Sequence, residues 1–463
     1  MYRKKNLIFL IIIILVSSFS YGTLKKIHTK YNAKIERLQN NYNKIVAKNK
    51  VDNEKFDEIK KFFLEENKFL NFQLSKNEIG ALGNNEIRVK TFTNHILPFS
   101  GKRSSLENHE NNLFILTGHG KLYYSNISNL SKDQIQFKKI ETNLESLVNK
   151  DYLRKFNTIF KDIIIKNSKV YISFTNWNSK IKPFNPAADN CYFTSVVSGD
   201  FSLNKINFID FFEMKECMPL FTNSAGSIMD KFKGNEILLT IGDYGSCSKL
   251  ARNFAQEDNH LAGKIIKINE IDGSFKILSK GHRNQQGIFY DKSKNIIFIT
   301  EHGPKSGDEI NINNLSKNQG NIKNYGWGSA SYGEHYDTNP EYEKKITKAC
   351  PLKKSHKENN FIEPIKYFVP SIAITQIIKE NNFIKNNEVD DIIYFSSLGY
   401  TSKEGRRSFH RIELLNNKKI EVKKHDYFTI SDRIRDMVYL KEIKKFILYL
   451  ELTGSLAVIS LEE

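Results

Sequence analysis

The stretch GHRNQQGIFYDKSKNIIFITEHGPKSGDEIN, residues 281–311, holds the densest pattern in this 463-residue chain. Its centre, Ile296–Thr300, is an apolar run of strand length that is rich in isoleucine. A polar turn, Lys292–Asn295, precedes the run, and Glu301–Pro304, which contains glycine and proline, follows it. Short β-branched runs between turn residues are typical of strands. The stretch therefore predicts a repeating unit made of a polar turn, a strand and a glycine-containing loop.

This unit recurs from about residue 85 onward. Runs rich in Ile, Val, Phe, Tyr or Leu lie at Leu113–Leu116, Val170–Phe174, Ile237–Ile241, Ile296–Thr300, Ile392–Phe395 and Phe446–Leu450. Their spacing, mostly about 55–65 residues, is long for a propeller blade but tolerable with loop insertions. Six such runs predict an all-β fold, a six-bladed β-propeller over residues 85–463. A pair of β-sandwiches is the alternative.

The composition favours some partners over others. The formal charge is +18, from 70 basic and 52 acidic residues, and 40% of the residues are hydrophobic. Such a charge can attract nucleic acid, an anionic membrane surface or an anionic ligand. The lysines are scattered among Asn and Glu rather than gathered into stripes with aromatic residues, which argues against nucleic-acid binding.

The N-terminus has the layout of an export signal. Residues 3–5 are basic, residues 7–16 are apolar, and small residues follow, as in a secretory signal. Residues 24–75 contain neither glycine nor proline, and apolar residues there alternate spacings of four and three, a coiled-coil seam. We therefore predict a signal anchor or a cleaved signal peptide at 1–22 and a helical coiled-coil stalk at 24–75. The stalk can pair two or three chains, and the head lies in the periplasm or outside the cell.

The cysteines suggest disulfides rather than a metal site. Cys191, Cys217, Cys247 and Cys350 form no C-x-x-C pair, which argues against zinc or thioredoxin-like redox chemistry. An even count in an exported chain suggests two disulfides. Cys191 and Cys217 flank one strand-like stretch and can bridge neighbouring strands, which would leave Cys247 with Cys350. The sequence does not choose among the three pairings, and four buried free thiols are the alternative.

The loops of the 281–311 stretch carry groups suited to an anion and to a cation. Arg283 is a fixed cation with a planar donor fork that suits a carboxylate, and Asn284 offers both a donor and an acceptor. Hard oxygen ligands, which suit Ca²⁺, come from Glu301, Asp308, Glu309 and Asn311. The alternative is a turn-rich loop with surface acids.

On these residues the chain resembles the glucose/sorbosone dehydrogenase family, which includes soluble PQQ-dependent glucose dehydrogenases and aldose sugar dehydrogenases. The family's turn G-x-R-N-P-Q-G and its T-E-H-G-P, D-E-x-N and N-Y-G-W motifs match Gly281–Gly287, Thr300–Pro304, Asp308–Asn311 and Asn324–Trp327. Gln285 stands in place of the proline. Further family segments are matched, in the expected order over residues 90–460, by Gly242–Asp243, Gly263–Ile265, Val369–Ala373 and Asp432–Asp436.

The resemblance implies a six-bladed propeller that binds pyrroloquinoline quinone (PQQ) and Ca²⁺. It implies oxidation of an aldose at the C1 hydroxyl, with hydride transfer to the quinone and onward transfer to an electron acceptor. The positions implied for the cofactor are Arg283, Asn284, Arg433 and Arg435. The carbonyls of Gly303 and Pro304 match those that hold the cofactor calcium, and the structural calcium stretch contains Asp308, Glu309 and Tyr325.

The resemblance breaks at the catalytic base. The best alignment puts Asn223 where the family has its histidine and Ser227 where it has an arginine. Asparagine cannot act as a general base at ordinary pH. Gly399 stands where soluble glucose dehydrogenases have a lysine that contacts PQQ, and Lys403 in the following loop is a potential substitute. Candidates for a relocated base are His119, His260 and His302.

Three functions are therefore consistent with the sequence. The first is a PQQ- and calcium-dependent sugar dehydrogenase with a relocated base. The second is a propeller that keeps calcium and a quinone-like ligand without oxidising sugars, and the third is a non-catalytic interaction head on a membrane stalk. The three arginines favour the first, because structural calcium does not need them, whereas Asn223 favours the others. The expected partners are a sugar or other polar small molecule, an electron acceptor, and the membrane through the N-terminal helix.

Overall fold

The computed structural model describes residues 68–94, 103–148, 159–177, 191–218, 224–317, 320–336, 339–399, 404–416 and 419–462. The chain divides into two units, Met1–Glu66 and Asn67–Glu463, and the described residues belong to the second. The predicted signal at 1–22 and the stalk up to residue 67 lie outside the described residues. Among the residues that are described, no helix is both long and apolar enough to cross a membrane.

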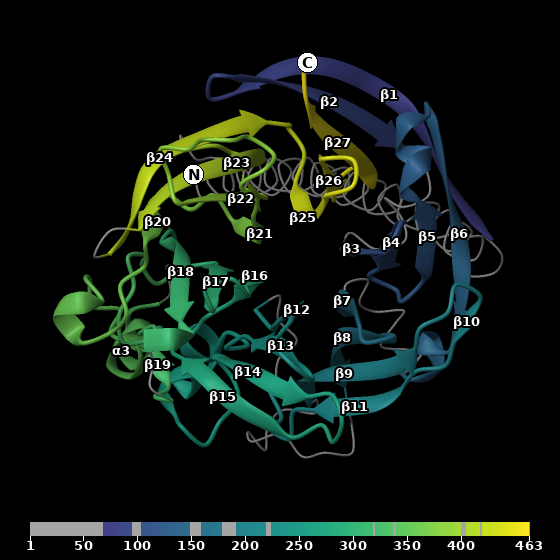
Figure 1. Ribbon diagram of the computed structural model, residues 1–463. Coiled ribbons are helices and arrows are strands. Elements are labelled where there is room, and N and C mark those ends of the chain that lie inside the picture. Colours follow the sequence, from purple (N-terminus) through teal and green to yellow (C-terminus); the bar gives the residue numbers. More distant parts are fainter. Residues whose placement is uncertain are drawn as a thin grey trace, which may run out of the picture. The chain divides into compact units, whose positions relative to one another are not determined.

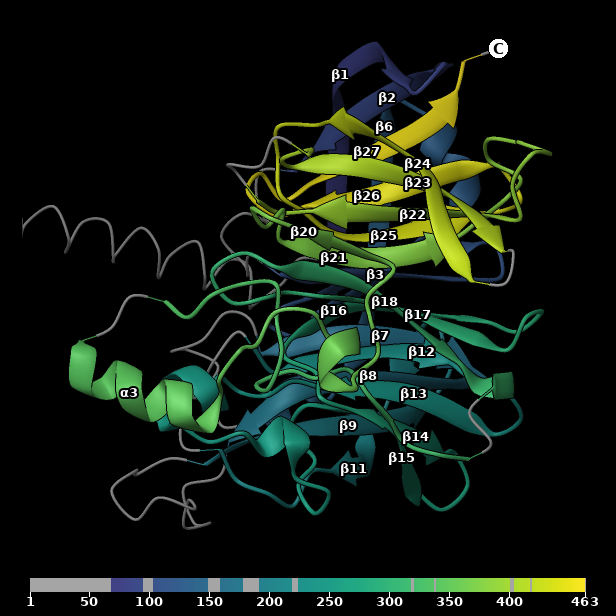
Figure 2. The same cartoon turned by 90° about the vertical axis from the view of Figure 1, so that its left-hand side faces the viewer.

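The second unit consists mainly of β-sheets (Figures 1 and 2). The largest sheet, in hydrogen-bonded order, contains β25 (Ile434–Leu440), β26 (Lys445–Leu450), β27 (Ser455–Leu461), β2 (Asn85–Thr93), β1 (Phe69–Leu82), β6 (Gln134–Thr142), β5 (Leu122–Asn126), β4 (Asn112–Thr117) and β3 (Ser104–His109), with β10 (Lys205–Ile206) beside β6. The second sheet contains β11 (Ile209–Glu213), β9 (Tyr192–Asp200), β8 (Lys169–Trp177) and β7 (Phe160–Lys166).

Three further sheets follow along the chain. One contains β12 (Gly226–Lys231), β13 (Glu236–Ile241), β14 (Lys264–Asn269), β15 (Phe275–Lys280) and β19 (Lys323–Asn324). The next contains β16 (Gln285–Asp291), β17 (Ile296–Glu301), β18 (Asp308–Asn314) and β20 (Lys366–Phe368). The last contains β21 (Ile374–Lys379), β22 (Asp391–Ser397), β23 (Ser408–Asn416) and β24 (Ile420–Thr429).

Helical segments are short. The α-helix α3 (Pro340–Ala349) begins at Asn339, whose side chain accepts a hydrogen bond from Tyr342 N, and has proline in its first turn. The other described segments are the 3₁₀ turns η2 (Ile127–Ser131), η3 (Leu144–Ser146), η5 (Phe254–Gln256), η6 (Leu315–Lys317) and η7 (Lys357–Asn359), and the π-helical turn η4 (Ser246–Leu250).

The innermost strands surround a central axis (Figure 1). In order they are β3, β7, β12, β16, β21 and β25, each in contact with the next, and β25 contacts β3. The apolar runs predicted as strands are all found as strands, and they form the second positions β4, β8, β13, β17, β22 and β26. Both faces of these strands are buried, as in β17, where every residue is buried. The predicted all-β, propeller-like fold is confirmed.

Buried aspartates join neighbouring innermost strands. Each accepts one hydrogen bond from the N–H of the next residue and one from the N–H of a neighbouring strand. The pairs between strands are Asp162 with Met229 N (2.6 Å), Asp230 with Tyr290 N (2.6 Å) and Asp436 with Leu106 N (2.8 Å). Burial raises the pKa of both Asp230 and Asp436 to about 7. These side chains fix the level of β7 relative to β12, of β12 relative to β16 and of β25 relative to β3.

Two N-terminal strands close the largest sheet. Strand β2 pairs with the C-terminal strand β27 from Ile87↔Leu461 to Phe92↔Leu456. Strand β1 then pairs with β2 on one side and with β6 on the other. The first and last described strands of the chain are therefore held in a single sheet.

Residues 69–75, predicted as the end of the helical stalk, are instead the first half of β1. Leu70 and Phe72 are buried, whereas Phe69, Asn71 and Gln73 are exposed, which is the period of two expected for a strand with one buried face. The helical prediction was wrong here because the absence of glycine and proline suits a strand as well as a helix. The sheet therefore begins before residue 85.

Both disulfides form with the pairing suggested by the sequence. Cys191 precedes β9 and Cys217 follows β11, and these two strands are hydrogen-bonded neighbours, which brings the two cysteines together. Cys247 lies in η4 and Cys350 follows α3. The second disulfide therefore ties the helical insertion to the loop after β13.

Candidate functional site

Arg283 lies in the turn before β16 and is fixed from three sides. Its backbone N–H donates to Glu301 Oε2 (3.0 Å), and its guanidinium donates to the carbonyl oxygen of His302 (3.0 Å). The guanidinium also lies over the indole ring of Trp327, 5.3 Å from the ring centroid, within the range of a cation–π contact. Arg283 is thus held in place by residues from two other motifs of the sequence.

Asp243 and Trp327, which belong to two motifs distant in sequence, meet next to Arg283. The backbone N–H of Asp243 donates to the carbonyl oxygen of Arg283 (2.7 Å), and Asp243 Oδ2 accepts from Trp327 Nε1 (2.8 Å). Burial raises the pKa of Asp243, and the nearby Arg283 charge opposes this rise. The motif pieces found separately in the sequence therefore form one structural unit around Arg283.

Arg433 and Arg435, near the start of β25, share one buried carboxylate. Glu451 Oε2 lies 3.4 Å from Arg433 Nε, 3.0 Å from Arg435 Nε and 2.6 Å from the second terminal nitrogen of Arg435. Arg433 also donates to the carbonyl oxygen of Leu398 (3.4 Å). Burial disfavours the ionised form of Glu451, but Arg435 and Arg433 outweigh it and lower the pKa of this carboxyl below its usual value.

A chain of hydrogen bonds connects the two arginine segments. Arg435 donates to Gln286 Oε1 (3.2 Å), and Gln286 Nε2 donates to Asn284 Oδ1 (2.9 Å). Asn284 Nδ2 lies 3.5 Å from His302 Nδ1. All four residues predicted to contact the cofactor are therefore linked in what we call the arginine network: Arg283, Asn284, Gln286, His302, Arg433, Arg435 and Glu451.

Two members of the arginine network had no role in the sequence predictions. Gln286 lies within the quoted motif, but nothing in the motif indicates that its side chain reaches β25, which is 149 positions away. Glu451 belongs to no motif. The ladder between β25 and β26 brings it beside the arginines, where its N–H donates to Arg433 O (2.7 Å). The only sequence signal for Glu451 was that it is an isolated acidic residue directly after a strongly apolar strand.

A pair of buried acids lies beside Arg283. Glu301 of β17 and Glu309 of β18 are directly opposite in the ladder, and Asn311 Nδ2 donates to both carboxylates, at 2.9 and 3.1 Å. His356 Nε2 lies 3.4 Å from Glu309. Burial, and next the neighbouring Glu301, raise the pKa of Glu309 well above its usual value. Among the described residues, Asn311 Oδ1 and His356 Nδ1 are buried without a hydrogen-bond partner.

The predicted metal residues divide into two groups. Glu309, Gly303 and Tyr325 line a small cavity of about 10 Å³, together with Arg283, Glu301, His302, Gly307, Trp327, Ala330, Ser331 and His356. Such a volume holds about one water-sized particle. Asp308 instead accepts from Gly303 N (3.0 Å), Ser371 Oγ (2.8 Å) and Ile374 N (3.2 Å). It thereby fixes the turn that contains Gly303 and Pro304.

The side chain of Tyr325 is also engaged. Its hydroxyl donates to Ile312 O (2.8 Å), and its ring stacks on His282 with centroids 4.7 Å apart. Within the described part of the chain, no group of three or more His, Cys, Asp and Glu side chains is arranged to hold a metal ion. A cation at this cavity would therefore need backbone or amide oxygens in addition to the two glutamates.

Asn223 and Lys403 lie outside the described residues, so the predicted position of the base stays a prediction. Ser227 is buried, and its hydroxyl lies 3.1 Å from that of Thr194 and donates to Ala225 O (3.2 Å). The N–H of Gly399 donates to Ile372 O (2.7 Å), and a side chain there would collide with that carbonyl. Neither position offers a charge to a ligand.

The three candidate histidines have different surroundings. His302 Nε2 lies 2.7 Å from Ile374 O, an acceptor, so Nε2 carries the proton and Nδ1 keeps the lone pair. Burial lowers the pKa of His302 to about 4. His260 stacks on Phe254 at 4.1 Å, and its Nδ1 accepts from Ala262 N; burial lowers its pKa to about 4 as well. His119 is buried. Of these three histidines, His302 is the one that belongs to the arginine network, through its contact with Asn284.

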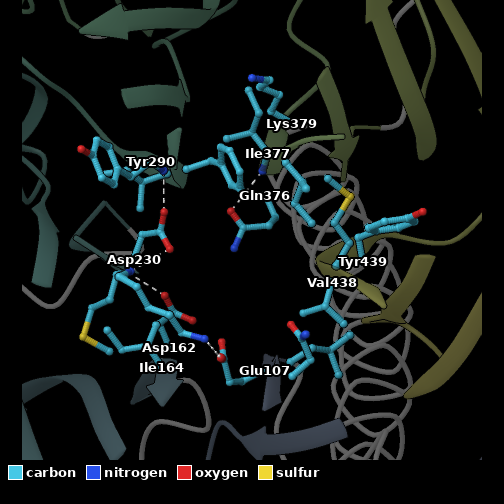
Figure 3. A pocket seen from close by; sticks show the side chains of 18 of the residues that line it. Glu107, Asp162, Ile164, Asp230, Tyr290, Gln376, Ile377, Lys379, Val438 and Tyr439 are labelled. Atoms are coloured by element: carbon cyan, nitrogen blue, oxygen red, sulfur yellow. Dashed lines mark hydrogen bonds and ion pairs between the residues drawn. The ribbon is translucent and has the colours of Figure 1, made fainter. Parts of the chain in front are cut away.

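A second, larger cavity of about 450 Å³ is lined by the innermost strands (Figure 3). Its polar lining includes Glu107, Asp162, Asp230, Gln376 and Lys379. Most of these groups have partners, for example Lys231 Nζ at 2.7 Å from Glu107. None of the predicted cofactor residues lines this cavity.

Comparisons with known proteins identify the family of the chain. The model of the family described as Glucose / Sorbosone dehydrogenase matches residues 160–456, more than half of the chain. An uncharacterized protein of Synechocystis sp. is 30% identical over 166 residues, which are 32% of this chain and 36% of that protein. An aldose sugar dehydrogenase of Escherichia coli is 35% identical over 98 residues, 18% of this chain and 25% of that protein. The matches thus span about a third or less of these relatives.

Solved structures share the fold. A glucose dehydrogenase has a TM-score of 0.58 at 18% identity, covering 79% of this chain and 97% of that chain. The soluble aldose sugar dehydrogenase of Escherichia coli in its apo form has a TM-score of 0.56 at 18% identity, covering 81% and 100%. The PQQ domain of pyranose dehydrogenase from Coprinopsis cinerea has a TM-score of 0.52 at 11% identity, covering 84% and 98%.

Proposed function

The chain belongs to the glucose/sorbosone dehydrogenase family, and from this premise we propose that it is a PQQ- and calcium-dependent sugar dehydrogenase that works outside the cytoplasm. The observation that carries the proposal is the arginine network. Four residues assigned to a cofactor by sequence, from segments about 150 positions apart, are linked by hydrogen bonds. A purely structural propeller has no need to bring three arginines to one place.

The residues of the arginine network suit a quinone with several carboxylates. Arg283 uses one terminal nitrogen for His302 O and rests on Trp327, which leaves further donors of its fork for a ligand. Glu451 fixes Arg435 and Arg433 so that their guanidinium groups are already ordered before binding. When bound, the quinone supplies the redox chemistry by accepting hydride from the sugar.

We propose that calcium binds at the small cavity beside Gly303. The carbonyls of Gly303 and Pro304 would hold the ion near the cofactor, with Glu309 and Glu301 as carboxylates and Asp308 fixing the turn. Tyr325 would contribute to the wall of the cavity. Two observations support the fit: Glu301 and Glu309 face each other across the ladder, and Asn311 Oδ1 lies buried there without a partner among the described residues. Carboxylate and amide oxygens are suitable calcium ligands.

The wider organisation is proposed on the same basis. The ring of innermost strands supports six blades. The two disulfides support an exported protein, with residues 1–22 as signal or anchor and the residues up to 67 as a stalk that can join two or three copies. His302, which contacts Asn284, is the candidate base that the geometry favours over His119 and His260.

A non-catalytic or differently active calcium-binding head is the second candidate. Asn223 in place of the family's histidine favours it, as does Ser227, whose hydroxyl bonds within the core. In that case the arginine network would bind an anionic ligand without turnover.

The test is to add PQQ and Ca²⁺ to the purified protein and to follow an artificial electron acceptor with a panel of aldoses. Calorimetry measures PQQ affinity in parallel. We expect Arg283→Ala and Arg433→Ala each to weaken PQQ binding about 30-fold or more, because each removes a charge-assisted contact. Arg88→Ala, which breaks an outer ion pair with Glu462, is the matched control.

Each result has a distinct meaning. PQQ binding without turnover supports the second candidate. If both site variants keep the PQQ affinity of Arg88→Ala, the cofactor assignment is wrong. If PQQ does not bind but calcium raises the melting temperature, the protein is a calcium-stabilised interaction head.

A further inference from the structure

The helical insertion between β19 and β20 carries a local excess of positive charge. Residues 340–358 contain six lysines and three glutamates. Lys354 is engaged, because its Nζ donates to the carbonyl oxygens of Tyr332 (3.0 Å) and Gly333 (2.6 Å). The other five, which we call the insertion lysines, are exposed and have no ion pair or side-chain hydrogen bond with a described residue: Lys344, Lys345, Lys348, Lys353 and Lys357.

The helix α3 presents three of the insertion lysines on its outward face. Ile346 of this helix is buried and Ala349, one turn later, is half-buried. Residues three or four positions apart share one face of a helix, so these two define the packed face. Lys344, Lys345 and Lys348 lie toward the opposite face, where they are exposed. Figure 2 shows α3 outside the sheets, with this face free of covering strands.

A disulfide and a small apolar core tie the insertion to the candidate site. Cys350, directly after α3, is bonded to Cys247 in the loop that follows Asp243. The guanidinium of Arg283 lies over Trp327, and Trp327 belongs to the buried cluster against which α3 packs through Ala349: Cys247, Ala255, Trp327, Cys350 and Leu352. The insertion lysines therefore border the site that we assign to the cofactor.

An exposed aromatic side chain lies in the same insertion. His335 Nε2 lies 2.6 Å from Cys350 O, which holds this part of the chain at the end of α3. The next residue, Tyr336, is 51% exposed. Transient interfaces between proteins combine aromatic residues such as tyrosine with a polar, charged rim. The insertion has both components.

We propose that the insertion lysines form the docking surface for the electron acceptor, and that this acceptor is a redox protein with an acidic surface. The inference rests on the proposed function and names the class of its partner. Oxidation of one aldose to its lactone releases two electrons and two protons. Two molecules of a one-electron acceptor, such as a haem protein, take up the electrons in turn, and the protons pass to water.

The distribution of the insertion lysines suits a protein better than a small anion. The charges are spread over α3 and the segment after it, so they form a surface. One exposed charge contributes little to binding, whereas an acidic protein surface meets several of them at once. Redox proteins form small, short-lived complexes, and complementary charges speed such encounters.

The test measures binding of the purified chain, without added cofactor, to the acidic haem protein cytochrome b5 and to the basic haem protein cytochrome c. We expect cytochrome b5 to bind at low salt and to be released at high salt, and cytochrome c not to bind. The triple variant Lys344→Glu, Lys345→Glu and Lys348→Glu should bind cytochrome b5 at least about tenfold more weakly.

The matched control reverses three exposed lysines elsewhere, on β6, on β10 and after β25: Lys138→Glu, Lys205→Glu and Lys441→Glu. It changes the net charge by the same amount, and its affinity for cytochrome b5 should stay within about twofold of the wild type. A weakening confined to the α3 variant supports the docking surface even when no dehydrogenase activity is found.

Three results overturn the inference, whether or not PQQ supports turnover. One is that cytochrome b5 does not bind. Another is that both triple variants weaken its binding equally, which would reflect net charge alone. The third is that the α3 variant keeps its affinity for cytochrome b5 but loses binding to vesicles of phosphatidylcholine and phosphatidylserine, which would assign the lysines to a membrane. If the α3 variant melts below the assay temperature, the double variant Lys353→Glu and Lys357→Glu, outside the helix, decides.

Discussion

Glu451 and Glu309 are both buried glutamates of the site, but their surroundings are opposite. Glu451 forms ion pairs with Arg433 and Arg435, and its pKa is lowered. Glu309 faces Glu301 and is contacted by the amide of Asn311, and its pKa is raised. The chain itself neutralises the first carboxylate, whereas the second needs a proton or a cation from outside. The comparison shows that the carboxylate on the arginine side of the site is already neutralised before any ligand binds. The carboxylate on the acidic side is not.

Removing Glu451 should have the largest effect. Glu451→Ala leaves Arg433 and Arg435 without their shared partner, and we expect it to lower the free energy of unfolding by about 3–5 kcal/mol. Urea denaturation measures this loss. Glu451→Gln should lose less, because it keeps an acceptor. The control is Glu462→Ala, which breaks the outer ion pair with Arg88 and should change the free energy of unfolding little. If Glu451→Ala changes it as little as this control does, the role of Glu451 is refuted.

Removing calcium should have the second-largest effect, and this effect should depend on the other glutamate, Glu309. A cation bound between Glu301 and Glu309 at a hundredfold excess over its Kd stabilises the fold by about 2.7 kcal/mol. We expect a chelator to lower the melting temperature of the wild type and of Glu451→Gln, but not that of Glu309→Gln. A chelator effect that persists in Glu309→Gln would place the calcium elsewhere.

Asp243 is an intermediate case, a buried acid with one cation nearby and a neutral donor. Trp327→Phe keeps an aromatic ring under Arg283 but removes the N–H that donates to Asp243 Oδ2. We expect a loss of about 1–3 kcal/mol in unfolding free energy, the cost of a buried acceptor without its donor. Trp327→Ala should cost more, since it also removes the cation–π contact. Equal losses in both variants would mean that the hydrogen bond contributes nothing.

The smallest effect concerns acid pH. Because the pKa of Glu451 is lower in the folded state, its contribution to stability is complete above the ordinary value of 4.5 and is lost as the pH falls through the folded pKa. We therefore expect the stability difference between the wild type and Glu451→Gln to narrow on acidification. Unfolding curves recorded from pH 7 to pH 3 test this, and a constant difference would contradict the proposed ionisation of Glu451.

Local sequence patterns predicted much of the fold and one of the two compared glutamates, Glu309. The apolar runs were visible as strands because four or five successive, mostly apolar residues between turns suit a sheet buried on both faces. Arg283 and Arg435 were identified from motif letters, and the structure joins them through Gln286. Glu451 was not identified, because its pairing depends on the β25–β26 ladder and not on any local pattern.

One wrong prediction and one unexpected set of contacts have the same physical origin. Residues 69–75 were assigned to a helix because their alternation is short and follows a long segment without glycine or proline. The pairing partners that make them a strand, β2 and β6, lie further along the chain. Likewise Asp308, chosen for its oxygens, bonds to Ser371 and Ile374, more than 60 positions away. Contacts at long range decided both cases.

The pairing of β2 with β27 has a consequence for how the protein is made. Strand β2 ends at Thr93, and its partner begins at Ser455, so the largest sheet cannot close until the chain has been synthesised through β27. Until then β2 has a free edge that can pair with other chains. If the protein is exported, a chain that crosses the membrane unfolded would complete its ring only after β27 has arrived.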